Sequence, residues 1–228
     1  MANSLGCAFA RQLLWSRSLV LLSLHKSSLP VLFAVALLSC PAWAQPAAKR
    51  EQACVVLLHG LFRSAAAMKP LEWYLEEAGY ATVNESYASI SRPIEELAEE
   101  AVGGGLRQCR SMGYQHIHFV AHSMGGVLVR QYASIHTLPH QTRVVMLGPP
   151  NQGSQVADYY SSLAWDGVEP AALAQLGTGD TSVPLRLGPV SFDLGVIAGS
   201  LREQTVLQGF PDEPSEGTVS VAEATVPG

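Results

Sequence analysis

Residues 117–132 read IHFVAHSMGGVLVRQY: an apolar run leads into Ser123, and a helix-compatible run follows at once. A serine on a sharp strand-to-helix turn needs small neighbours two positions away, because the turn crowds the strand and the helix together. Ala121 and Gly125 meet this need. The pattern predicts a nucleophile elbow, in which the helix also points N–H groups toward an anion formed at the serine. The alternative is a buried strand whose serine only caps the helix.

A second apolar segment lies upstream of this serine. Residues 54–62 read CVVLLHGLF, which is typical of a buried strand that ends in His-Gly. Acyl transfer needs two N–H donors for its oxyanion, one directly after the nucleophile and one in the loop after an earlier strand. We expect these donors to be the main-chain N–H groups of Met124 and Leu61, with Gly60 allowing close approach of the backbone. His59, at the end of a buried strand, is expected to be structural rather than the general base.

These motifs resemble the small bacterial lipases and esterases of the α/β-hydrolase family. The resemblance covers about residues 54–228 and rests on the elbow AHSMGG at 121–126, the strand LLHGL at 57–61, the loop LGPPNQGS at 147–154 and the segment GTVSV at 217–221. It implies a mostly parallel central sheet flanked by helices, in one domain over residues 45–228. It also implies a hydrolase that cleaves carboxylic esters through an acyl-enzyme at Ser123. The substrate would be a small-molecule or lipid ester, with no cofactor and with transient contact to a membrane surface.

The catalytic acid is one place where the sequence departs from these relatives. They carry an Asp directly before the Gly-x-Val, whereas this chain has Glu216. A glutamate can accept a hydrogen bond from a histidine ring and stabilise the imidazolium, provided that its extra methylene is accommodated. We therefore expect Glu216 to be the acid, with Asp212 as the alternative. Both residues also fit a solvated acidic loop.

The general base is the larger departure. In this fold the triad follows the chain order Ser, acid, His. All seven histidines of this chain precede both acid candidates: His25, His59, His116, His118, His122, His136 and His140. The sequence is therefore expected to lack a last strand, a base-bearing loop and a closing helix at its C-terminal end. An oxyanion hole alone leaves only residual catalysis, so a catalytically impaired fragment or a non-catalytic binding protein is the second functional hypothesis.

Residues 1–44 have the pattern of a secretory signal peptide. They carry cations and no acidic residue, then an apolar run at 29–38, then Ala42-Trp43-Ala44. We expect cleavage near Ala44 and export to the periplasm or the medium. An uncleaved membrane anchor and lipid attachment at Cys40 are the alternatives.

Charge and cysteine content fit an exported protein. The leader holds three of the 14 Lys and Arg and none of the 19 acidic residues, so residues 45–228 have a net charge of −8. This excess of acid argues against nucleic acid as a partner, since phosphate binding needs a basic stripe. Two cysteines follow the leader, Cys54 and Cys109, and an even pair in an oxidising compartment predicts a disulfide. Two buried thiols are the alternative. The sequence contains no metal-ligand cluster or phosphate-loop motif.

The remaining segments alternate as in an α/β protein. We expect a helix over 65–78, whose apolar face is formed by Leu71, Trp73, Tyr74 and Leu75, and a helix over 92–109 that is interrupted at 103–105. Further strands are expected at 81–83, from residue 144 onward and at 194–198. Residues 159–189, rich in Gly, Ala and Pro, are expected to form an irregular cap or rim over the cleft.

Overall fold

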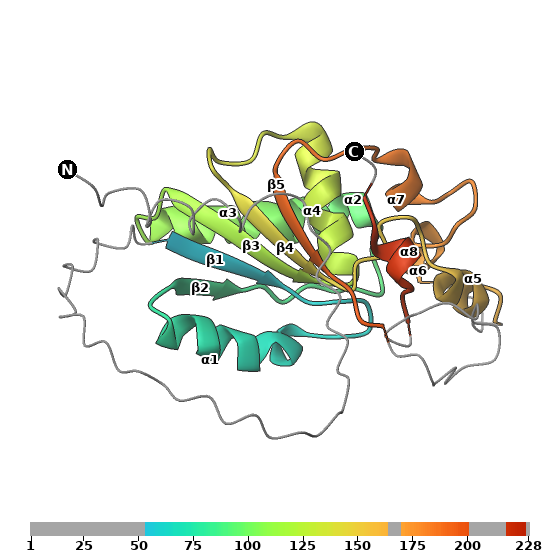
Figure 1. Cartoon of the computed structure of the whole chain (residues 1–228), viewed down its shortest axis with the longest axis horizontal. Helices are drawn as coiled ribbons and strands as arrows, with labels where there is room; N and C mark the ends of the chain where they lie inside the picture. The colour runs from blue at the N-terminus through green and yellow to red at the C-terminus, as the bar shows by residue number, and fades with distance from the viewer. Residues whose placement is uncertain (1–52, 164–169, 201–217, 227–228) are drawn as a thin grey trace, which may run out of the picture. The chain divides into compact units, whose positions relative to one another are not determined.

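The computed structural model describes residues 53–163, 170–200 and 218–226 (Figure 1). Within these residues, five parallel strands form one sheet in the order β2-β1-β3-β4-β5. The strands are β1 (Ala53–Leu58), β2 (Ala81–Asn84), β3 (His116–His122), β4 (Arg143–Leu147) and β5 (Asp193–Ile197). The predicted strands at 81–83 and 194–198 therefore exist, each within one residue of the predicted bounds.

Helices connect the strands. They are η1 (Ala65–Met68), α1 (Lys69–Glu77), α2 (Ile94–Leu97), η2 (Ala98–Val102), α3 (Gly103–Ser111), α4 (Met124–Ile135), α5 (Gln155–Ser161), α6 (Ala171–Gln175), α7 (Val183–Arg186) and α8 (Val221–Ala224). None of the helices in the described ranges has the length and apolar character that crossing a membrane requires.

Strand β1 is buried on both faces because helices cover both sides of the sheet there (Figure 1). Side chains alternate along a strand, so its even- and odd-numbered residues face opposite sides. Cys54, Val56 and Leu58 join the main core with α3 and α4. Val55 and Leu57 pack on the opposite side with η1 and α1. The loop that follows β1 therefore starts from a strand held on both faces.

The helical segment from α2 to α3 runs through the three glycines without the interruption predicted at 103–105. The turn before them, η2, is π-helical, and Gly103 to Gly105 are themselves helical. The reason lies in the packing: a Cβ on Gly105 would overlap Val56 Cγ1 of β1. The glycine run thus permits a close approach of helix and strand, and it does not break the helix.

A disulfide joins β1 to α3. It connects Cys54 and Cys109, whose Cα atoms lie 5.9 Å apart and which are separated by 55 residues in sequence. Both cysteines are fully buried. Closing a loop of this length contributes on the order of 4 kcal/mol to stability in the chain-entropy model. The bridge fastens α3 to the strand that leads into the predicted oxyanion loop.

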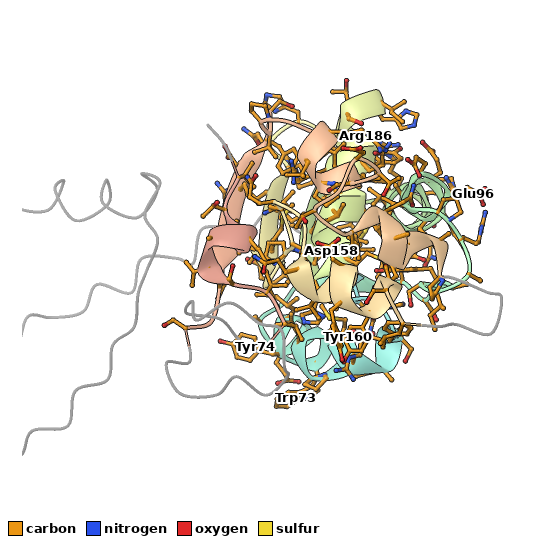
Figure 2. All side chains as sticks on the ribbon, turned by 90° about the vertical axis from the view of Figure 1, so that its right-hand side faces the viewer. Trp73, Tyr74, Glu96, Asp158, Tyr160 and Arg186 are labelled. Carbon is orange, nitrogen blue, oxygen red and sulfur yellow. A yellow bond between two sulfur atoms is a disulfide. The ribbon has the colours of Figure 1, made fainter. Side chains whose placement is uncertain are left out.

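Helix α1 differs from the prediction in its buried face. Leu71 and Leu75, one turn apart, pack against the β1 side chains Val55 and Leu57. Trp73 and Tyr74 are instead 65% and 66% exposed, and Figure 2 shows both at the molecular surface. The apolar stripe of α1 is therefore narrower than the sequence suggested.

The region predicted to be an irregular rim, 159–189, contains short helices in its described parts. Helix α5 enters it, and α6 and α7 lie within it. The side chain of Ser182 accepts a hydrogen bond from the Leu185 N–H, and Pro184 occupies the first turn of α7, so local capping explains this helix. That the region covers a cleft stays a prediction.

The adjacent glycines Gly104 and Gly105 should respond oppositely to substitution by alanine. A Cβ on Gly104 meets the Glu85 carboxylate at an ordinary 3.5 Å, so Gly104→Ala should stabilise the helix by about 0.5–1 kcal/mol. Gly105→Ala should destabilise the protein by about 1–3 kcal/mol through overpacking against Val56. Urea unfolding of both variants measures the two shifts. Shifts of the same sign would contradict the close packing of α3 on β1.

Candidate active site

Ser123 occupies the turn between β3 and α4, at the carboxyl edge of the parallel sheet. It has φ 52° and ψ −122°, a backbone conformation that residues with a side chain rarely adopt. The Ser123 N–H donates to Leu147 O of β4 at 2.8 Å, and the Gly126 N–H donates to Ser123 O at 2.9 Å. These bonds offset the cost of the strained turn, which is about 1–3 kcal/mol. The turn has the strand–turn–helix geometry of a nucleophile elbow.

The first turn of α4 packs directly on the end of β1. A Cβ on Gly125 would lie 2.8 Å from Leu58 O and 3.0 Å from His59 O. A Cβ on Gly126 would lie 2.9 Å from Met146 Sδ of β4. Larger residues at these positions would push α4 away from the sheet, so the small residues after Ser123 have a steric cause.

Gly60 brings the loop after β1 against the nucleophile turn. A Cβ on Gly60 would lie 2.8 Å from His122 Nδ1 and 3.1 Å from Ser123 Cβ. Leu61, the next residue, is half-buried and packs against the main core. The peptide unit between Gly60 and Leu61 is therefore a close neighbour of Ser123.

His59 holds this peptide unit in place. Its Nδ1 lies 2.9 Å from Gly60 O; because a carbonyl only accepts, Nδ1 carries the proton. Its Nε2 is then an acceptor and receives the Tyr87 N–H at 3.5 Å. The Tyr87 ring stacks on the imidazole at a centroid distance of 3.9 Å, and the Tyr87 hydroxyl donates to His59 O. Both ring nitrogens are occupied, so His59 has a structural role.

Burial keeps the histidines around this turn neutral. Desolvation lowers the pKa of His59, and the hydrogen bond to Gly60 opposes this shift only in part. Desolvation also lowers the pKa of His122; the positive charge of Arg63 lowers it further, as does electrostatic coupling to His59. Neutral imidazoles add no positive charge next to Ser123.

The two predicted oxyanion donors have no competing acceptor. In the ranges that the structure describes, no hydrogen bond engages the N–H of Leu61 or of Met124. Met124 is the first residue of α4, where the N–H has no partner within the helix and the helix dipole is positive. Because a trans peptide is planar, the Leu61 N–H points away from Gly60 O and from the His59 ring bound to it. That both N–H groups converge on one oxyanion stays a prediction.

The described residues include neither candidate acid nor a histidine that is hydrogen-bonded to Ser123. Glu216 and Asp212 lie outside the described residues, as does His25. None of the six histidines in the described ranges forms a hydrogen bond with Ser123 Oγ. His118 accepts the Arg143 N–H at 3.2 Å, and His136 lies 2.5 Å from Glu99, at the other end of α4 from Ser123.

The loop after β4, residues 148–154, binds the segment 218–226, which we call the C-terminal segment. The Gln152 N–H donates to Glu223 O at 2.8 Å, and the Gln155 N–H donates to Glu223 Oε1 at 2.8 Å. Ser220 and Glu223 also form a capping box at the start of α8. These contacts could not be predicted from the sequence, because the partners are about 70 residues apart and show no shared local pattern.

The parallel sheet, its helical crossovers and the strained serine at its carboxyl edge define an α/β-hydrolase fold. No family model matches the sequence, and no curated protein matches it. The structure is similar to the mature form of the lipase BlEst2 from Bacillus licheniformis, with a TM-score of 0.60 and 21% identity over 78% of this chain and 81% of that chain. It is also similar to phospholipase PlaB from Legionella pneumophila, with a TM-score of 0.59 and 19% identity over 76% of this chain and 45% of that chain.

A third similar structure is the lin2722 gene product from Listeria innocua, with a TM-score of 0.51 and 18% identity over 76% of this chain and 77% of that chain. The chain spans less than half the length of PlaB and of the propeptide form of BlEst2. At these identities the similarity establishes the fold.

Within the described residues, no group of three or more His, Cys, Asp or Glu could hold a metal ion.

Protonation of His59 should destabilise the fold. Its pKa is lowered from the ordinary 6.5, so the native state holds the ring neutral and the unfolded chain binds the proton more readily. The stability from the neutral ring is complete above about pH 6.5 and is lost as the pH falls below it, with a slope of up to about 1.4 kcal/mol per pH unit. His59→Gln should be less stable at pH 7 but should lose less stability between pH 7 and 5. Urea unfolding at stepped pH tests this; equal slopes for the two proteins would show that His59 titrates normally in the native state.

Proposed function

We propose that this chain is a serine hydrolase that cleaves carboxylic esters through an acyl-enzyme at Ser123. The observation that carries the proposal is the positive φ of Ser123 at the carboxyl edge of the sheet, with Gly60 and Gly125 packed closely around the turn. Support comes from the similar structures, two of which are a lipase and a phospholipase. The substrate class is a small-molecule or lipid ester.

In the proposed reaction, Ser123 Oγ attacks the carbonyl carbon of the ester. The carbonyl oxygen becomes an oxyanion and accepts hydrogen bonds from the N–H groups of Leu61 and Met124. Each such donor is worth about 2.7–4 kcal/mol in the transition state. The base takes the Ser123 proton and gives it to the departing alcohol, and water then hydrolyses the acyl-enzyme by the same route.

Glu216 is the proposed acid, with Asp212 as the alternative. Its carboxylate would accept a hydrogen bond from the ring of the base and stabilise the imidazolium that forms during acyl transfer. The side chain would act by orientation and charge, and would not take up the proton itself.

The base decides between two candidate functions. In the described part of the chain no imidazole is hydrogen-bonded to Ser123, and this observation favours the second candidate, a hydrolase-like protein that binds an ester without turning it over. A serine with an oxyanion hole but no base is slower by a factor on the order of 10⁴–10⁶. The first candidate requires that a base reach Ser123.

We also propose that the protein is exported, with residues 1–44 as a signal peptide cleaved near Ala44. The disulfide between Cys54 and Cys109 supports export, because such bridges form and persist in oxidising compartments. The region after the leader is acidic, which fits a periplasmic or secreted enzyme that does not bind nucleic acid.

A fluorophosphonate probe should phosphonylate Ser123. This follows from its half-buried position on the strained turn and from the two proposed N–H donors. Mass spectrometry of the labelled protein locates the adduct. Ser123→Ala should abolish labelling, whereas Ser111→Ala, a matched change of an exposed serine on α3, should label as the native protein does. Labelling at another residue would refute the assignment of the nucleophile, and no labelling at all would favour the binding protein.

Added imidazole should accelerate ester hydrolysis that depends on Ser123. If no residue of the folded chain serves as base, a small external base should restore part of the missing proton transfer. The measurement is the rate of p-nitrophenyl acetate hydrolysis against imidazole concentration, with the rate of Ser123→Ala subtracted at each concentration. A fast rate that imidazole does not change would show that a base is already in place, and His122→Gln would then test the ring next to the nucleophile.

A further inference from the structure

Arg130 is a buried charged residue on the nucleophile helix that the proposed chemistry does not use. It lies on α4, about two turns after Ser123, and is only 3% exposed. Its Nη1 donates to Asn151 O at 2.9 Å and to Asn151 Oδ1 at 3.1 Å. Its Nη2 donates to Pro184 O at 3.2 Å and to Gly188 O at 2.9 Å. The guanidinium therefore joins α4 to the loop after β4 and to the region of α7.

The charge of Arg130 is held by neutral oxygens. Within the described residues, it has no salt bridge to a carboxylate, and burial lowers the pKa of Arg130 to about 10. Its Nε has no hydrogen-bond partner there. A buried cation without a counter-ion is a costly way to stabilise a core. We therefore attribute to the hydrogen bonds of Arg130 mainly the placement of the loop after β4 and of the α7 region on α4, and only a small part of the free energy of folding.

Asn151 extends this connection to the C-terminal segment. Its side chain accepts from Arg130 through Oδ1 and donates through Nδ2 to Ala224 O at 2.9 Å. Asn151 is only 1% exposed, so both bonds are shielded from water. A carboxamide both accepts and donates, which neither a carboxylate nor an aliphatic side chain can do. Three parts of the chain that are distant in sequence therefore meet at Asn151.

Helix α8 depends on these contacts for its position. It has four residues, too few for a stable isolated helix. The loop after β4 holds it through Asn151, through the bond from the Gln152 N–H to Glu223 O, and through the bond from Gln152 Nε2 to Thr225 O at 3.1 Å. That loop is in turn fixed to α4 by Arg130.

We propose that Arg130 and Asn151 are positioning residues that hold the C-terminal segment at a fixed place relative to Ser123. That this positioning matters for catalysis rests on the proposed hydrolase function. Thr218, at the start of the segment, is two residues from Glu216 in sequence, so the proposed acid is joined directly to the segment that Arg130 and Asn151 hold.

Asn151→Asp is the sharpest test. The carboxylate still accepts from Arg130, with a charge-assisted bond that keeps this side of the network. It has no N–H to donate to Ala224 O. The carboxylate oxygen that replaces Nδ2 would repel Ala224 O, so the C-terminal segment should loosen. Hydrogen exchange of the Glu223, Ala224 and Thr225 amides should accelerate at least tenfold, while the amides of β1 and β3 keep their native rates.

Matched variants separate position from stability. Arg130→Met should accelerate the same amides, Arg130→Lys should do so less, and Arg110→Met, which removes an exposed arginine of α3, should have no effect. Arg130→Met leaves the buried acceptors of Arg130 without a donor and could therefore prevent folding. In that case the result for Asn151→Asp decides the test. Native exchange rates for the C-terminal segment in folded Asn151→Asp would overturn the proposal.

Hydrolysis adds a readout that a merely structural role would not change. In Asn151→Asp, kcat for p-nitrophenyl acetate should fall at least tenfold with KM nearly unchanged, and the pH profile should shift. Faster exchange with native kcat would refute the role in positioning. If the wild-type protein neither hydrolyses the ester nor reacts with the fluorophosphonate, the proposed function has failed, and exchange still decides whether Arg130 and Asn151 hold the segment.

Discussion

The close approach of two backbones at the end of β1 is the constraint on which the site depends. Gly125 brings the first turn of α4 against Leu58 O, and Gly60 brings the loop after β1 against Ser123 Cβ. Only residues without a side chain fit at these two points. The approach surrounds Ser123, which has a strained backbone conformation, and brings the peptide unit after Gly60 next to it. Without this approach, the serine would be an ordinary helix cap.

The elements around β1 keep this approach rigid. Side chains of β1 are buried on both faces, α3 packs on it without room for a Cβ at Gly105, and the disulfide from Cys54 fastens the same helix. At the end of the strand, the ring of His59 stacks on Tyr87 and donates a hydrogen bond to Gly60 O. A rigid strand is the physical requirement for an oxyanion hole, because its donors must be in place before charge develops.

Sequence patterns predicted what depends on local sterics and on residue counts. The elbow followed from Ala121 and Gly125 around Ser123, and two cysteines in a chain that we expect to be exported indicated the disulfide. The predicted break at Gly103 to Gly105 was wrong, because the sequence does not show that Val56 occupies the space beside the helix. Trp73 and Tyr74 were assigned to a buried face that the sheet does not cover. The bonds of Arg130 and Asn151 join residues 21 to 73 positions apart, and such contacts leave no local pattern.

A crystal structure of the protein after reaction with a phosphonate ester would test the central claim most directly. The phosphorus should be bound to Ser123 Oγ, and its oxygen should lie about 2.7–3.1 Å from the N–H groups of both Leu61 and Met124. That result would show that the close approach at Gly60 and Gly125 builds an oxyanion hole around a nucleophile. A phosphonyl oxygen that faces solvent, or one bound by neither N–H group, would contradict the account.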